Sequence, residues 1–342
     1  MPPLTMRAFV ITGPGRGEVR DVERPTAGPG EVVVDVERVG LCGTDVELFT
    51  GRMAYLASGE ASYPIRIGHE WAGVVSTVGS GVDRTWLGRR VTGDTMLGDQ
   101  TCDRCRSGRQ YLCENRYEVG IRRGWPGALA EQLVVPAWSL RDLPATVDVT
   151  AGALVEPGGN AWRALDAAAI GAGERLLIIG AGAIGFLAAL IARAQGADVT
   201  VAGRSPASIE FARSLGFTTI ESASLAAGDR FAGVIDASTG NRSPALAVEH
   251  VEPGSRVVYI GLSGEPSLVD SRRLVLQDVT AIGILSASPG LDGGIELFAS
   301  GAVDPRPLVA AVVGLDDVAG VLSGKRDAAW GTAPKVHVDP RR

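Results

Sequence analysis

Three short motifs with side chains that can bind a transition metal occur at separate points along the first half of the chain. Cys42 lies in a Gly-Leu-Cys-Gly-Thr-Asp run, His69 and Glu70 are adjacent, and Glu156 stands before a proline. A thiolate, an imidazole and a carboxylate can hold a catalytic zinc ion and leave one coordination position open for a substrate oxygen. Each residue alone could equally be a core residue, but their order and combination predict such a zinc site.

A glycine-rich turn further along the chain has the pattern of a dinucleotide-binding site. The apolar run 175–179 leads into Gly-Ala-Gly-Ala-Ile-Gly, and an apolar helix is expected after it. The first glycine would permit a tight turn, the second a close approach to a pyrophosphate, and the third close packing of helix on strand. The helix N-terminus would add free amide donors for phosphate. A glycine-rich turn without a ligand is the alternative. The predicted cofactor contacts here and after two later strands are Gly180, Gly182, Ala183, Ile184, Gly185, Ala237 and Leu262.

The end of the next strand indicates which nicotinamide cofactor is bound. An NAD site normally has Asp or Glu at this place, where it binds the ribose 2′-hydroxyl. This chain has Gly203, Arg204 and Ser205 instead, and Asp198 belongs to the opposite end of the strand. The glycine removes repulsion, the arginine can clamp a 2′-phosphate, and the serine can donate a hydrogen bond. NADP(H) is therefore predicted over NAD(H), the alternative being that Arg204 is an ordinary solvated charge.

Length and composition limit the class of protein. The 342 residues are enough for two domains, and contents of 45% hydrophobic and 21% charged residues are ordinary for a globular enzyme. The net charge is -6 without a basic cluster, which argues against nucleic acid or an anionic membrane as a partner. No stretch approaches the roughly 18 apolar residues of a membrane span, and no secretory signal is evident. We therefore expect a cytoplasmic protein, in which its four cysteines favour metal ligation over disulfides.

The pattern of apolar residues changes near Glu156. Before it, short strand-like runs such as 31–39 and 130–135 alternate with Gly and Pro turns, which predicts a β domain of barrel or sandwich type. From about Gly158 to Ser300, apolar strands alternate with helices, which predicts a doubly wound α/β domain. Strands are expected at 175–179, 199–202, 233–236, 256–260 and 280–284, and one helix from its cap at Ser205 to its exit at Gly216.

These motifs together resemble the zinc-dependent medium-chain dehydrogenases over nearly the whole chain, and most closely their glucose and polyol branch. The residues that carry the resemblance are Cys42 to Asp45, Gly68 to Glu70, Asp99 to Cys113, Val155 to Pro157 and Gly180 to Gly185. The resemblance implies an α/β protein with a GroES-like β-barrel catalytic domain, a Rossmann cofactor domain and a final return to the first domain, assembled as a homodimer or homotetramer. The implied ranges are 1–157 with a metal lobe at 98–115, then 158–300 and 301–342.

The resemblance also implies roles at the catalytic zinc. Cys42 and His69 match the family's two constant ligands, and Glu70 matches a glutamate that binds the metal or lies beside it. Glu156 stands where alcohol-specific members often have cysteine and where polyol and sugar members have glutamate. Thr44 matches the hydroxyl residue that bonds the substrate oxygen and passes on its proton, although a turn threonine bonded to local backbone would look the same.

A second metal lobe is implied by the family's spacing of four cysteines. This chain keeps the spacing but begins it with Asp99, followed by Cys102, Cys105 and Cys113. Because carboxylate oxygen can bind zinc, a structural zinc on three thiolates and one carboxylate is predicted. A lobe with three free thiols and no metal is the alternative.

Substrate contacts follow from the resemblance alone. Glu47 occupies a position where many relatives carry a histidine of the proton relay, and a glutamate there resembles the glucose dehydrogenase branch. The relay would then run through Thr44, carboxylates and water. Thr95, Glu118 and Asn160 fall near positions that contact sugar hydroxyls. The glycines before Asn160 depart from the apolar runs of relatives, so the identity of a sugar stays open.

The combined prediction is a zinc-dependent oxidoreductase. It would transfer a hydride between NADP(H) and a secondary alcohol or ketone of a sugar, polyol or cyclitol-like compound. A dehydrogenase of simpler alcohols and a zinc-free reductase of quinones or enones keep the same fold. A cofactor-binding protein without turnover is a further alternative from another class.

Overall fold

The computed structural model describes residues 5–342, which form two compact units. The first unit contains the chain up to Glu156 together with 309–331 and 335–342, and the second contains 157–308 and 332–334. Residues 301–308, expected in the returning segment, therefore belong to the second unit. Within residues 5–342, no helix is both long and apolar enough to cross a membrane.

The first unit is mainly β-structure. Its helices are short: α1 (Gly43–Thr50), α2 (Ala54–Ala57), α3 (Asp103–Arg106), α4 (Val149–Gly152) and α11 (Val318–Leu322). Its strands are β1 (Thr5–Gly13), β2 (Arg16–Glu23), β3 (Glu31–Gly40), β4 (Glu70–Val78), β5 (Arg90–Gly93), β6 (Met96–Leu97), β7 (Tyr117–Glu118), β8 (Gln132–Pro136), β9 (Leu140–Asp142), β16 (Val309–Val313) and β17 (Lys335–Val338).

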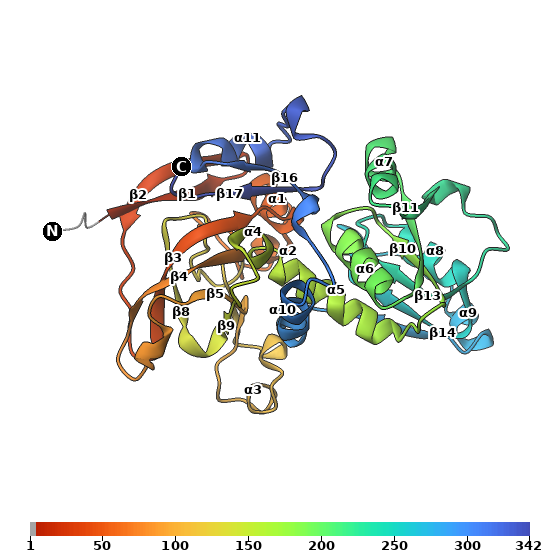
Figure 1. Ribbon diagram of the computed structural model, residues 1–342, viewed down its shortest axis with the longest axis horizontal. Coiled ribbons are helices and arrows are strands. Elements are labelled where there is room, and N and C mark those ends of the chain that lie inside the picture. The colour runs from red at the N-terminus through yellow and green to blue at the C-terminus, as the bar shows by residue number, and fades with distance from the viewer. Residues whose placement is uncertain (1–4) are drawn as a thin grey trace. The chain divides into compact units, whose positions relative to one another are not determined.

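One seven-stranded sheet organises this unit (Figure 1). Its order is β16-β17-β3-β4-β5-β9, and β8 also pairs with β3. The valines of β3 are buried at nearly every position, because this central strand packs on both faces. β17 joins the sheet beside β3 although the whole second unit separates the two strands in sequence. The late segment thus completes the sheet next to the predicted ligand Cys42.

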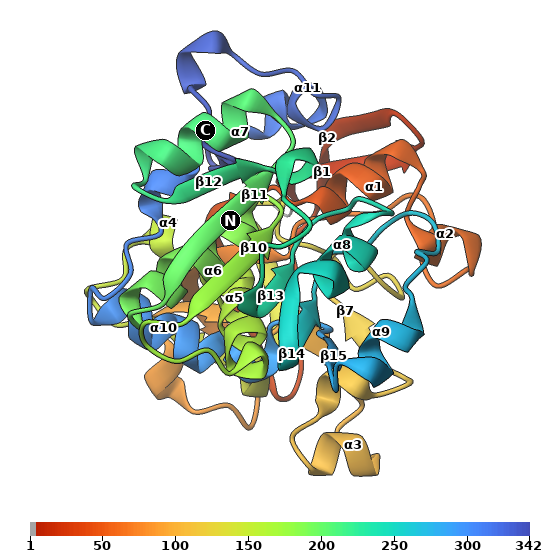
Figure 2. The ribbon, with the colours of Figure 1, turned by 90° about the vertical axis from the view of Figure 1, so that its right-hand side faces the viewer.

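The second unit is a parallel α/β structure (Figure 2). Its strand order is β12-β11-β10-β13-β14-β15, which is the doubly wound order, with the switch point of strand order beside β10. The strands are β10 (Arg175–Ile179), β11 (Asp198–Gly203), β12 (Thr218–Glu221), β13 (Phe231–Asp236), β14 (Val251–Tyr259) and β15 (Thr280–Gly283). The helices are α5 (Val155–Ala168), α6 (Ala183–Ala194), α7 (Pro206–Ser214), α8 (Ser243–His250), α9 (Ser271–Leu276) and α10 (Leu291–Ala299), and α5 begins at the end of the first unit.

The reversal of strand order places helices on both faces of this sheet. Right-handed crossovers through α6 and α8 run in opposite directions from the sheet centre, so the two helices cover opposite faces. The loops after β10, β11 and β13 consequently meet at one edge, where their carboxyl ends lie. The predicted helix cap is confirmed, since Ser205 Oγ accepts a hydrogen bond from the backbone N–H of Ser208 at 3.1 Å.

Candidate functional site

A cluster of metal-ligand atoms lies where β3 ends and β4 begins. One ligand atom from each of Cys42, His69 and Glu70 lies within 4.8 Å of the others. Cys42 is the N-cap of α1, and the antiparallel register pairs Gly40 with Glu70. Sheet pairing therefore brings together side chains that are distant in sequence.

Asp45 orders two of the candidate ligands, Cys42 and His69. Its Oδ2 accepts the backbone N–H of Cys42 at 2.9 Å, and its Oδ1 lies 3.6 Å from His69 Nδ1. Both facing atoms are buried, and neither has a hydrogen-bond partner within residues 5–342. A carboxylate facing one ring nitrogen fixes the tautomer and leaves Nε2 for a metal, a common arrangement around zinc. Burial lowers the pKa of His69, but Asp45 and Cys42 outweigh it, so the pKa lies well above its ordinary value without metal.

Glu70 is held by a buried lysine. Lys335 Nζ on β17 lies 2.5 Å from both carboxylate oxygens of Glu70 and donates to the carbonyl of Leu41 at 3.1 Å. The two side chains are 4% and 1% exposed. Burial lowers the pKa of Lys335, yet the charges of Glu70 and Cys42 raise it more, so the ammonium is retained. With both oxygens engaged, Glu70 is better placed beside a metal than as its principal ligand.

The other predicted catalytic residues lie near this cluster in sequence or on a separate helix. Thr44 is on the first turn of α1, partly exposed, and its hydroxyl has no partner among residues 5–342. Glu47 follows on the same helix, and burial raises the pKa of its carboxyl group. Glu156 lies in the first turn of α5, outside the group formed by the three ligands above, and has interactions of its own. Its role as a zinc ligand remains a prediction.

His337 lies two residues beyond Lys335 and has an unusual environment. It is fully buried, and neither ring nitrogen has a hydrogen-bond partner in the described part of the chain. Burial, assisted by Lys335 and Arg38, lowers its pKa to about 3 from an ordinary value of 6.5. The folded protein therefore keeps a neutral imidazole that the unfolded chain would protonate below pH 6.5.

This histidine predicts a pH-dependent stability. Between pH 6.5 and about 3 the free energy of unfolding should fall by roughly 1.4 kcal/mol per pH unit, because protons bind preferentially to the unfolded chain. Above pH 6.5 this contribution is absent. Urea unfolding of the wild type and of His337→Leu at pH 7 and pH 5 should show a smaller loss for the variant. Equal losses in the two proteins would assign the effect to other groups.

The cysteine lobe forms a second cluster of potential ligands. Ligand atoms of Asp99, Cys102, Cys105 and Cys113 lie within 4.8 Å of one another, and all four cysteines of the chain are unpaired. Asp99 Oδ1 accepts the backbone N–H groups of Thr101 and Cys102 at 2.9 and 3.0 Å, and Asn115 donates to Oδ2. These bonds hold the pKa of Asp99 well below its usual range, so it would present a carboxylate to a metal.

The residues predicted to contact substrate are engaged with protein groups. The Thr95 hydroxyl donates to the carbonyl of His69 at 3.4 Å. Glu118 is buried and accepts from Tyr55 Oη at 3.0 Å and from Arg116 Nε at 2.9 Å. Asn160 is buried on α5 with an interaction of its own. These contacts position the site's surroundings and leave direct substrate contact as a prediction.

The second unit contains a cavity of about 920 Å³ at the carboxyl edge of its sheet. Gly180 has φ +116°, a value that side chains rarely tolerate, and a Cβ on Gly185 would lie 1.9 Å from the Gly180 carbonyl oxygen. Around Gly182 there is open space. Of the predicted contacts, the cavity is lined by Gly180, Gly182, Gly203, Arg204, Ser205 and Ala237. Ala183, Ile184 and Gly185 are not on its lining, and Leu262 lines a separate cavity of about 500 Å³.

Hydroxyl groups gather beside Arg204 in the larger cavity. Ser208 contributes its hydroxyl at the start of α7, and Ser222 Oγ donates to the carbonyl of Gly203 at 3.2 Å. Arg204 itself is exposed and forms no ion pair within the described chain. A free guanidinium, several hydroxyls and a helix N-terminus together suit a phosphate group.

Sequence reasoning did not identify Asp45 or Lys335 as functional residues. Asp45 was visible as part of the cysteine motif, and a fully buried aspartate beside a ligand is a recognisable positioning group. Lys335 lies 265 residues from Glu70 and could have been noticed only as a charge opening an apolar strand.

Comparison with known proteins identifies two domain families along the chain. Residues 28–145 match the alcohol dehydrogenase GroES-like domain, and residues 183–300 match the zinc-binding dehydrogenase domain. The chain is 31% identical to a 2-dehydro-3-deoxy-L-galactonate 5-dehydrogenase of Pseudoalteromonas atlantica, over 84% of this chain and 86% of that protein. It is 34% identical to an L-threonine 3-dehydrogenase of Saccharopolyspora erythraea, over 82% and 83% of the two chains.

A solved structure shares the whole architecture. The zinc-binding dehydrogenase of Sinorhizobium meliloti 1021, bound to NADP, superimposes with a TM-score of 0.89 at 28% identity, over 98% of this chain and 99% of that one. The predicted GroES-like and Rossmann fold is thereby confirmed. One explanation accounts for the two matched domains, the two candidate metal clusters and the glycine turn. The chain belongs to the zinc-type medium-chain alcohol dehydrogenase family.

Proposed function

We propose that the protein is a zinc-dependent oxidoreductase that transfers a hydride between NADP(H) and a secondary alcohol or ketone of a sugar, polyol or cyclitol-like compound. The observation that carries the proposal is the cluster of Cys42, His69 and Glu70, ordered by Asp45, in a member of a dehydrogenase family. When bound, zinc supplies a Lewis acid for the substrate oxygen, and nicotinamide supplies or accepts the hydride.

The residues of the chain suit the metal and the proton. Cys42 and His69 would hold zinc with a glutamate, either Glu156 or Glu70. The Thr44 hydroxyl, which has no hydrogen-bond partner among the described residues, would take the proton of a substrate hydroxyl. Glu47, whose pKa is raised by burial, would receive it on the same helix and pass it to water. A second zinc on Asp99 and the three lobe cysteines would be structural.

NADP(H) is favoured over NAD(H) by the residues at the end of β11. No carboxylate follows this strand, and Arg204 is free to pair with a 2′-phosphate. The NADP in the Sinorhizobium structure agrees with this preference but belongs to a protein of only 28% identity.

Replacing Arg204 should reverse this preference. Arg204→Asp is expected to lower kcat/KM for NADP about 100-fold and to change kcat/KM for NAD by less than about threefold, because the lost interaction is charge-assisted and specific to the 2′-phosphate. Initial rates with both cofactors measure the effect. Arg204→Lys is the matched control: it keeps the charge without the planar fork and should lose about tenfold or less. A wild type that prefers NAD would refute the assignment.

A substrate screen tests the proposed reaction. Sugars, sugar acids and polyols should be compared with simple secondary alcohols, using enzyme of measured zinc content. L-threonine belongs in the panel, because a threonine dehydrogenase is 34% identical to this chain. Turnover that survives complete removal of zinc would support a quinone or enone reductase instead. NADPH binding with no turnover on any substrate would support a protein without catalytic activity.

We further propose that the protein is a homodimer or homotetramer. β15 is an edge strand with three exposed residues out of four, and the neighbouring Leu268, Val275 and Leu276 are each at least 80% exposed. Exposed apolar side chains beside a free strand edge favour pairing with a second copy. Light scattering at micromolar concentration would give the molar mass and so test whether a dimer or tetramer forms. A cytoplasmic location likewise stays a prediction.

A further inference from the structure

A second arginine lines the cavity that contains Arg204. Arg242 directly precedes α8 and is exposed, and like Arg204 it has no ion-pair partner within the described chain. The carboxylate that shares the lining with them is Glu249. It lies seven residues further along, so α8 separates it from Arg242 by about 10 Å. Two uncompensated positive charges therefore face one cavity.

The position of these arginines allows them to approach one group. Arg204 follows β11 and Arg242 lies in the loop after β13, and the single strand β10 separates those strands in the sheet. Strands two positions apart lie roughly 10 Å from each other. Extended arginine side chains from two such loops can converge on a ligand between them.

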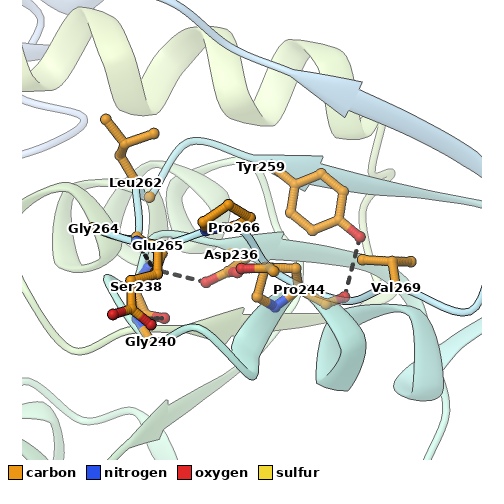
Figure 3. A pocket seen from close by; sticks show the side chains of 13 residues that line it. Asp236, Ser238, Gly240, Pro244, Tyr259, Leu262, Gly264, Glu265, Pro266 and Val269 are labelled. Carbon is orange, nitrogen blue, oxygen red and sulfur yellow. Dashed lines mark hydrogen bonds between the residues drawn. The ribbon is translucent and has the colours of Figure 1, made fainter. Parts of the chain in front are cut away.

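A buried hydrogen-bond network fixes the loop that carries Arg242. Asp236, 1% exposed at the end of β13, accepts the backbone N–H of Ser238 at 3.0 Å, as Figure 3 shows. It also accepts the Ser243 hydroxyl at 2.8 Å. The Ser243 hydroxyl also lies 2.7 Å from the carbonyl of Gly240, and the Ser238 hydroxyl donates to the Ser243 hydroxyl. Bonds at both ends of the loop thus hold the backbone around Arg242.

β14 and the residues after it also contact this loop. Tyr259 Oη on β14 donates to the carbonyl of Pro244 at 3.1 Å, as Figure 3 shows. A Cβ on Gly261 would meet the Ser238 carbonyl oxygen at 1.9 Å, so the two loops are in close backbone contact. A charge on a rigid loop binds more tightly than one on a mobile loop, because less conformational entropy is lost.

From this arrangement we infer that Arg242 is a second specificity-determining residue of the cofactor site, and that it contacts the 2′-phosphate of NADP(H) from the wall opposite Arg204. This inference rests on the proposed preference for NADP(H). It assigns to the Asp236 network the role of positioning Arg242. The ligand chemistry is a phosphate monoester on the adenosine ribose, as distinct from the pyrophosphate at the glycine turn.

Binding of adenosine fragments tests the inference without any turnover. Calorimetry would compare 2′,5′-ADP with 5′-ADP on the full chain, wild type and Arg242→Gln. The variant is expected to bind 2′,5′-ADP about tenfold more weakly and 5′-ADP within twofold of the wild type. Ser243→Ala, which loosens the loop without touching the charge, should show a smaller loss with the same selectivity. Arg272→Gln, on an exposed pair with Asp270 outside the cavity, serves as the matched control and should change neither affinity.

The outcomes separate this inference from the cofactor proposal. If the wild type binds both fragments equally, the preference for NADP(H) is wrong and the inference falls with it. If the wild type prefers 2′,5′-ADP but Arg242→Gln keeps that preference, the inference alone is wrong. Equal weakening of both fragments would place Arg242 at the pyrophosphate or the adenine and would also overturn it. The expected result is that Arg242→Gln loses its preference for 2′,5′-ADP. In a double Arg204→Gln/Arg242→Gln variant, the loss of 2′,5′-ADP affinity should then differ from the product of the two single losses.

Discussion

Replacement of Cys42 by serine is expected to lower kcat by three orders of magnitude or more and to remove one zinc per chain. Serine is nearly the same size but offers a neutral hydroxyl in place of a thiolate, so the ligand group that includes His69 loses its softest member. Without the metal, the charge that develops on the substrate oxygen loses its main stabilisation, which is worth several kcal/mol. Metal analysis and steady-state rates on the same sample give both results.

The other cysteine lobe provides a matched control. Cys113→Ser makes the same chemical change at a buried cysteine of the second cluster. It should remove a different zinc and lower the melting temperature, while kcat per folded molecule stays within a few-fold of the wild type. Binding of NADPH, followed by fluorescence, should be unchanged in Cys42→Ser, since that cavity is formed entirely by the second unit. Full activity of Cys42→Ser with one zinc lost would refute the catalytic assignment.

Lys335→Met is expected to destabilise the folded protein by roughly 3–5 kcal/mol, because it leaves the Glu70 carboxylate buried without its positive partner. Methionine approximates the lysine side chain in length, so little of the loss should come from a cavity. Urea unfolding at a fixed, saturating zinc concentration measures the effect. A metal that takes over the carboxylate would reduce the loss, and repeating the measurement after zinc removal would reveal this.

The second member of the pair shows whether charge or packing is responsible. Glu70→Gln combined with Lys335→Met removes both charges and should recover most of the stability lost in the single variant. If the double variant is no more stable than Lys335→Met, the ion pair is not the source of the effect. Arg306, whose pair with Asp304 is about half exposed, offers a comparison: Arg306→Met should cost less than about 1 kcal/mol.

Local patterns in the sequence predict five of the six strands of the second unit, whereas β12 was not predicted. The apolar run before Gly180, the glycine spacing and the Ser205 cap each follow from interactions within a few residues, and the structure has β10, α6 and α7 at those places. Cys42 and His69 were also predictable as candidate ligands, because residue type and neighbouring motif single them out without knowledge of the sheet.

Features that depend on pairing between distant segments were not predictable in the same way. Nothing in the local sequence of Lys335 shows that β17 lies beside β3, and the partner Glu70 was considered only as a metal ligand. Asp236 could not be identified from its local sequence either, because its role depends on hydrogen bonds that fix a loop several residues away. Glu118 and Thr95 are predicted substrate contacts through the family resemblance, and the structure shows that each also bonds a protein group.

The position of β17 has a consequence for the order of events during synthesis. A ribosome makes β3, β4 and the candidate ligands Cys42 and His69 first, then all of residues 157–308, and only afterwards the strand that brings Lys335 to Glu70. The second unit can fold before β17 has paired with β3 in the first unit. Nascent chains stalled before residue 335 should therefore bind nucleotide but release zinc readily, so metal loading is expected to be a late step in maturation.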